Sequence, residues 1–97
     1  MSKTLVLLSD LEPRGIELAA EAKDTNIALC LLQDAVFFAI NKKESIDSIM
    51  KQNKKIYALE DDVNLRGLKD FIDPKIKLVS YADVIDIVLE HDTTLNF

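Results

Sequence analysis

Two stretches of the chain pass directly from an apolar strand pattern into the start of a helix. The first is LLQDAVFFAI, residues 31–40, and the second is YALEDDVNLRG, residues 57–67. In each, a short apolar run meets carboxylates, and apolar side chains then continue at helical spacing. A strand that leads into a helix N-terminus, twice in a small chain, is typical of a parallel α/β sheet with acidic groups at its carboxyl edge.

The rest of the chain extends this alternation. Four apolar runs predict strands at residues 3–8, 27–32, 55–59 and 76–79. Helical patterns lie between and after them, at residues 13–22, 33–40, 46–50, 63–68 and 82–90, with breaks at 23–26 and 41–43. We therefore predict a single three-layer α/β/α domain over residues 1–97, with a mainly parallel sheet of about four strands and a C-terminal tail at 91–97.

Charge and cysteine content exclude several classes of function. The net charge is −5, and we expect no direct binding of nucleic acid, because a phosphate backbone requires clustered Lys and Arg. Lys51, Lys54 and Lys55 do cluster, and we interpret them as a solvated helix end. The single cysteine, Cys30, cannot form an internal disulfide and fits a reducing compartment. No apolar run has the length of a signal peptide or a membrane span, so we expect a cytoplasmic protein without membrane contact.

The predicted strand-to-helix turns meet at one edge of the sheet, where open α/β sheets bind ligands. We expect Asp10, Asp34 and Asp61 to cap helices there. The sharper alternative is the metal site of a phosphoacceptor receiver domain, which needs a fifth strand with a lysine near its end, and four strands are predicted here. Neither Gly15 nor Gly67 lies in a phosphate-binding glycine motif. We therefore expect no metal ion and no cofactor.

Covalent chemistry would depend on Cys30, which lies in the fully apolar second strand. We interpret it as a small core residue whose pKa is raised by burial, so that little thiolate forms. His91, the only histidine, follows the last helix, where contact with the helix dipole is favoured over catalysis. One cysteine and one histidine cannot form a catalytic triad or a zinc site.

The second motif contains two structural signals. Gly67 is placed to end a short helix in the left-handed conformation. Arg66 is expected to pair with Asp62, four residues earlier on the same helix face, or to reach a carboxylate on a partner chain.

The motifs together resemble the DsrH/TusB family over nearly the whole chain. They are LLQDAV at 31–36, YALEDDVNLRG at 57–67, YADVIDIVLEH at 81–91 and the terminal aromatic Phe97. The resemblance implies the small Rossmann-like DsrE/F/H fold and a subunit of a sulfur-relay complex, built with two homologous small subunits as paired heterotrimers. Such complexes pass persulfide sulfur from protein to protein. In the TusB branch the sulfur ends as the 2-thio group on the wobble uridine of certain tRNAs, and in the DsrH branch it belongs to sulfur oxidation.

The resemblance also implies a non-catalytic role for this chain, because the most important relay cysteine lies on a sister subunit. Residues 16–22 lack the cysteine that some members carry in the first helix, and Phe97 stands where tryptophan is common. The positions that match family motifs are interpreted as structural or interface residues: Gln33, Asp34, Asp61, Arg66, Gly67 and Phe97.

Two other functions remain open at this point. One is a homo-oligomeric binding or regulatory module of the same fold, and the other is a persulfide carrier that uses Cys30. The segment Val36, Phe37, Phe38 and Ile40 is apolar nearly all round, which suits burial on two sides, either by a partner or within the chain's own fold.

Overall fold

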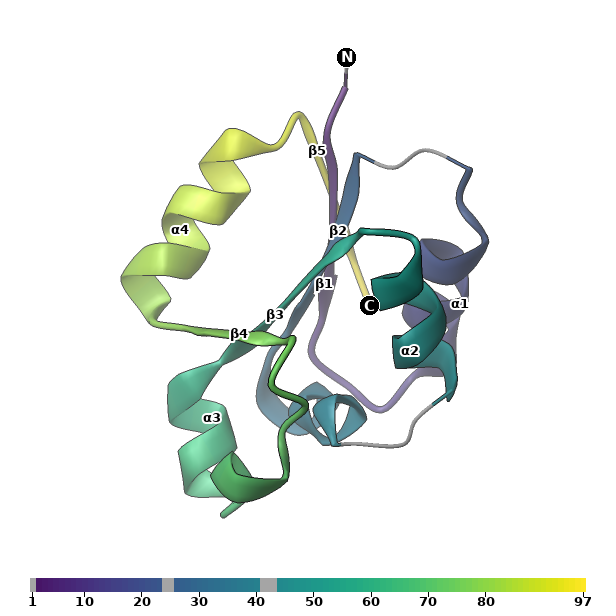
Figure 1. The fold of residues 1–97 in the computed structure, drawn as a ribbon. Coiled ribbons are helices and arrows are strands. Elements are labelled where there is room, and N and C mark those ends of the chain that lie inside the picture. Colours follow the sequence, from purple (N-terminus) through teal and green to yellow (C-terminus); the bar gives the residue numbers. More distant parts are fainter. Residues whose placement is uncertain (1, 24–25, 41–43) are drawn as a thin grey trace.

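The structure is a computed structural model that describes residues 2–23, 26–40 and 44–97 (Figure 1). Its strands are β1 (Thr4–Leu8), β2 (Ile27–Leu31), β3 (Lys55–Leu59), β4 (Lys77–Val79) and β5 (Thr93–Asn96). Its α-helices are α1 (Pro13–Glu21), α2 (Glu44–Lys51), α3 (Glu60–Leu65) and α4 (Tyr81–Glu90), and its 3₁₀ helices are η1 (Gln33–Ala39) and η2 (Lys69–Phe71). The breaks predicted at 24–25 and 41–43 lie outside the described residues.

All neighbouring strands of the sheet are parallel, in the order β4-β3-β2-β1-β5. The α/β class and the parallel sheet are therefore confirmed. The prediction of a C-terminal tail is wrong, because residues 93–96 form β5 and pair with β1 from Thr4↔Thr93 onward. Three of the four residues of β5 are polar and three are exposed, so this edge strand gives no apolar run to detect in the sequence.

Helices cover both faces of the sheet (Figure 1). Helices α1 and α2 lie on one side and α4 lies on the other. The larger core cluster joins α1, α2 and η1 to the first face, and a smaller cluster joins Ile87 of α4 to the second. Every residue of β2 is buried, because this strand lies in the middle of the sheet between the two clusters.

The apolar segment around η1 belongs mainly to the chain's own core. Val36 and Ala39 are fully buried, and Phe38 packs against the larger cluster. Only Phe37 is exposed, at 37% of its surface. The segment could have been buried either by a partner or within the chain's own fold, and the described residues show burial within the fold.

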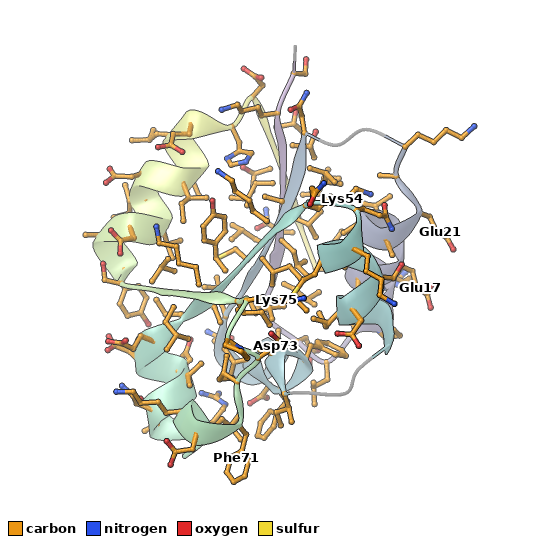
Figure 2. All side chains as sticks on the ribbon, viewed as in Figure 1. Glu17, Glu21, Lys54, Phe71, Asp73 and Lys75 are labelled. Carbon is orange, nitrogen blue, oxygen red and sulfur yellow. The ribbon has the colours of Figure 1, made fainter. Side chains whose placement is uncertain are left out.

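The interpretation of Lys54 as part of a solvated helix end is wrong. Its side chain is 4% exposed, and its ammonium donates to the carbonyl oxygens of Ala19 at 2.7 Å and Ala22 at 2.6 Å (Figure 2). It also donates to Gln52 Oε1 at 2.6 Å. Lys54 thus caps the C-terminus of α1, where the helix dipole favours a cation and the last carbonyls need donors.

The C-terminal residue is docked by backbone and side-chain contacts. The Phe97 N–H donates to the Leu7 carbonyl at 2.8 Å, and the Ser9 N–H donates to the Phe97 carbonyl at 2.9 Å. A Cβ at Gly15 would lie 2.8 Å from Leu8 Cδ1 and 3.1 Å from Phe97 Cδ2. A residue with a Cβ at position 15 would therefore force Leu8 and Phe97 to shift, and Phe97 is not a free aromatic tail.

The described residues contain no helix that combines the length and the apolar character needed to cross a membrane.

We predict that Gly15→Ala lowers the free energy of unfolding by about 1–3 kcal/mol, because the added methyl group overpacks the contact with Leu8 and Phe97. Urea unfolding followed by circular dichroism measures this change. In a Phe97→Ala background part of the space is vacant, so the same substitution is expected to cost at least 0.5 kcal/mol less, roughly the smallest coupling that a double-mutant cycle resolves. Equal costs in both backgrounds would contradict the proposed contact.

Candidate functional site

Cys30 lies in the middle of the sheet, on the face that α4 covers. Its register partners are Leu7 of β1 and Tyr57 of β3. Its side chain belongs to the smaller core cluster, together with Leu5, Ala28, Val79 and Ile87. The residue is 0% exposed, so the predicted burial of this thiol is confirmed.

Burial also sets the chemistry of the thiol. Removal from water raises the pKa of Cys30 to about 12. Only about one thiol in 10⁵ is then ionised at pH 7, and the thiolate is the form that attacks sulfur. The neighbouring Tyr57 likewise has a raised pKa, first because of burial and then because of the charge of Glu90. Both side chains are therefore protonated at neutral pH.

At the carboxyl edge, Asp62 holds the turn between β2 and η1. Its Oδ2 accepts a hydrogen bond of 2.6 Å from the backbone N–H of Gln33, and the residue is 8% exposed. Gln33 has a φ of +49°, a left-handed conformation that is costly for a residue with a side chain. The charge-assisted hydrogen bond that the Gln33 N–H donates to this buried carboxylate offsets the cost and fixes the start of η1.

Arg66 joins Asp34, a predicted site residue, to Asp62 across the same edge. Its Nη2 lies 2.9 Å from Asp34 Oδ1, and its Nη1 lies 3.5 Å from Asp62 Oδ1. The predicted pair with Asp62 is confirmed, and the contact with Asp34 adds η1 to it. Arg66 therefore neutralises two carboxylates at once and links α3 to the LLQDAV turn.

The capping prediction for the carboxylates is wrong. Asp34 and Asp61 lie in the first turns of η1 and α3, but neither helix has a side-chain hydrogen bond at its N-cap. Asp10 accepts instead from the N–H of Leu11, before α1 begins. Side-chain caps are formed by Glu12 at α1 and by Ser80 at α4, because these residues directly precede their helices.

The remaining predicted residues, Asp61, Gly67 and Phe97, take no part in the ion pairs that Arg66 forms with Asp34 and Asp62. Gly67 follows α3 with a φ of +66°, and no atom within 4 Å would obstruct a Cβ, so the left-handed dihedral alone requires glycine there. Asp61 is exposed on α3, and Phe97 lies beside β1. Sequence reasoning treated Asp62 only as the partner of Arg66. Asp62 is the last of three consecutive carboxylates after β3, and nothing in that run predicts its hydrogen bond with the Gln33 N–H.

The described residues contain no group of three or more His, Cys, Asp or Glu side chains that could hold a metal ion. The fifth strand, Thr93–Asn96, also carries no lysine, and the strand order differs from the 2-1-3-4-5 order of flavodoxin-like folds.

Two hollows lie at the opposite, amino edge of the sheet, with volumes of about 430 and 220 Å³. They share Asn53, Lys55 and Tyr57 in their walls. The larger is also lined by Lys75 and Lys77, and the smaller by Glu90 among others. Tyr57, the register partner of Cys30 on the neighbouring strand, therefore lies in the walls of both hollows, and Cys30 does not line either of them.

Comparisons with known proteins agree with this architecture. A family described as "DsrH like protein" matches residues 16–94. Protein TusB of Enterobacter sp. (strain 638) is 35% identical over 69 residues, which are 71% of this chain and 73% of that protein. Protein TusB of Yersinia pestis (strain Pestoides F) is 34% identical over 67 residues, 69% of this chain and 70% of that protein.

Solved structures show the same fold. The ychN protein from E. coli superposes with a TM-score of 0.88 at 16% identity, over 100% of both chains. A conserved protein of unknown function from Bacteroides thetaiotaomicron superposes with a TM-score of 0.78 at 14% identity, over 98% of this chain and 95% of that one.

We predict that Asp62→Asn destabilises the protein by about 1–3 kcal/mol, because a neutral amide weakens the bond to the Gln33 N–H and removes one partner of Arg66. The matched control is Asp61→Asn, which changes the same functional group on an exposed neighbouring residue and is expected to stay within about 0.5 kcal/mol of the parent. Thermal unfolding of the two variants gives both values. Equal destabilisation by the two would show that general charge, and not the Gln33 turn, is responsible.

Proposed function

The chain belongs to the DsrH family, and on this basis we propose that it is a non-catalytic subunit of a sulfur-relay complex. The burial of Cys30 is the observation that supports the non-catalytic role. A subunit of this kind supports transfer between cysteines of its partner proteins and carries no sulfur itself.

The chemistry of persulfide transfer explains why burial matters. An acceptor thiolate attacks the terminal sulfur of a donor persulfide, a new S–S bond forms, and the donor cysteine leaves as a thiolate. The acceptor must therefore be ionised and must reach another protein. Cys30 meets neither condition, since its pKa is about 12 and its side chain is fully buried in the core. These two facts oppose the alternative of a persulfide carrier on Cys30.

The proposed partners are two homologous small subunits of the same relay. Two relatives named TusB, at 34–35% identity, favour the branch that supplies the 2-thio group of wobble uridine in tRNA over the branch of sulfur oxidation. We further propose that residues 1–97 act as one domain in the cytoplasm. Support for one domain comes from the single sheet, which includes strands from both ends of the chain.

The matched motif residues have structural or interface roles in this proposal. Gln33, Asp34 and Arg66 fix the turn after β2 through the contacts described above. Gly67 ends α3, and Phe97 anchors β5 beside β1. Asp61 is exposed and free to face a partner subunit.

We predict that iodoacetamide modifies native Cys30 at least about 10³-fold more slowly at pH 7 than the urea-unfolded chain, since the rate follows the thiolate fraction. Because the folded pKa is about 12, the rate should rise tenfold per pH unit well beyond pH 9, until the thiol ionises or the protein unfolds. Mass spectrometry of quenched samples measures it. Tyr57→Gly, which opens the wall beside the hollows, should speed the reaction, whereas modification of the parent within minutes would refute the burial argument.

We predict that Cys30→Ala retains sulfur transfer in the native cell, measured as the 2-thiouridine content of tRNA after nuclease digestion. Deletion of the whole chain is expected to abolish that modification, because the complex then lacks a subunit. A loss of 2-thiouridine in the alanine variant, at unchanged protein level, would assign a relay role to Cys30 and overturn the proposal. Unchanged 2-thiouridine in the deletion strain would exclude the tRNA branch.

A further inference from the structure

Helix α4 has more apolar side chains than its own fold buries. Seven of its ten residues are apolar, and of these only Ile87 is buried, at 7% exposure. Tyr81, Ile85 and Leu89 are 60%, 61% and 77% exposed. An isolated exposed leucine is ordinary, but three large apolar residues on one helix form a patch that marks an interaction site.

The spacing of these residues makes the patch continuous. Tyr81, Ile85 and Leu89 follow one another at intervals of four, so they form a single stripe along the helix. The inner side of α4 is used by Val84, Ile87 and Val88, which pack in the cluster around Cys30. No described element lies on the side of α4 that faces away from the sheet (Figure 1).

The charges beside this stripe all have one sign. Asp83, Asp86 and Glu90 are the only charged residues of α4, and helical geometry places them together along one side of the stripe. Asp83 is partly used within the chain, because hydrogen bonds with Ser80 and, more weakly, the charge of Lys77 lower its pKa. Asp86 remains exposed beside the stripe, and Glu90, which is exposed but also lines the smaller hollow, extends this acidic border at the C-terminal end of α4.

We propose that the outer face of α4 docks a different chain, a sister subunit whose apolar groove is bordered by Lys or Arg. This inference rests on the proposed function, and charge complementarity selects the occupant. A second copy of this chain is disfavoured, because antiparallel pairing of two α4 helices about Ile85 brings their acidic borders together, with Asp86 of one copy beside Asp83 of the other. Each copy also carries a net charge of −5.

The test uses the full chain co-expressed with the two homologous subunits encoded in the same genome. The double variant Ile85→Glu, Leu89→Glu is expected to weaken the complex roughly 30-fold or more, the size typical of central apolar interface residues. Sedimentation velocity and titration of the purified subunits measure this. The matched control is Leu11→Glu, which adds the same charge at a 52% exposed leucine that precedes α1, and it should leave the affinity unchanged.

Charge reversal distinguishes the two occupants by the sign of its effect. Asp86→Lys with Glu90→Lys is expected to weaken binding of the sister subunit about tenfold at low salt and to reduce its salt dependence. If a second copy occupied the face, the same change would relieve repulsion and strengthen self-association. A chain that self-associates alone, and loses this in the Ile85, Leu89 variant, would overturn the proposal.

The remaining outcomes separate this inference from the proposed function. If the parent complex forms and both α4 variants bind normally, the docking surface is elsewhere, and only the inference fails. If the parent chain binds neither sister subunit, the proposed function itself fails. Circular dichroism melting of each variant shows whether it is folded, which is expected because all the changed side chains are exposed.

Discussion

The central strand β2 must be hidden from water on both faces, and much of the rest of the structure follows from this. All five of its residues are buried, and parallel sheets are stable only when helices cover both sides. On one face of the sheet α1, α2 and η1 cover the strand, and on the other face α4 packs in the cluster around Cys30. A thiol placed in this strand is therefore inert as a consequence of the fold itself.

The sequence predicted those parts of the fold that have strong local signals. Apolar runs predict β1 to β4, and the position of Gly67 directly after a short helical pattern predicts its left-handed conformation. The sequence did not predict β5, because an edge strand can be polar and so lacks an apolar run. Its pairing with β1 also joins residues about 90 positions apart, which no local pattern reveals. The sequence also did not predict that Lys54 caps α1, because a buried lysine and a solvated lysine cannot be distinguished by residue type, and the carbonyls that Lys54 contacts are distant in the chain.

The candidate site shows the same division. Burial of Cys30 followed from its neighbours in the chain, and the Arg66–Asp62 pair followed from helical spacing. The bond from Gln33 to Asp62 joins residues 29 positions apart and depends on a left-handed turn, which no spacing rule reveals. The apolar segment at residues 36–40 was the sequence's candidate for contact with a partner, but most of it packs in the chain's own core, and the exposed apolar stripe of α4 was not predicted.

Helix α4 connects the two properties that define the proposed role. Its inner side chains close the cluster that contains Cys30, and its outer stripe is exposed. A ligand that binds only the closed conformation stabilises it by an amount that grows with its concentration over its Kd. A partner docked on α4 would therefore hold the helix against the sheet and reduce any opening that exposes the thiol. Assembly and inertness of Cys30 then reinforce each other, which suits a subunit that positions reactive partners without competing for their sulfur.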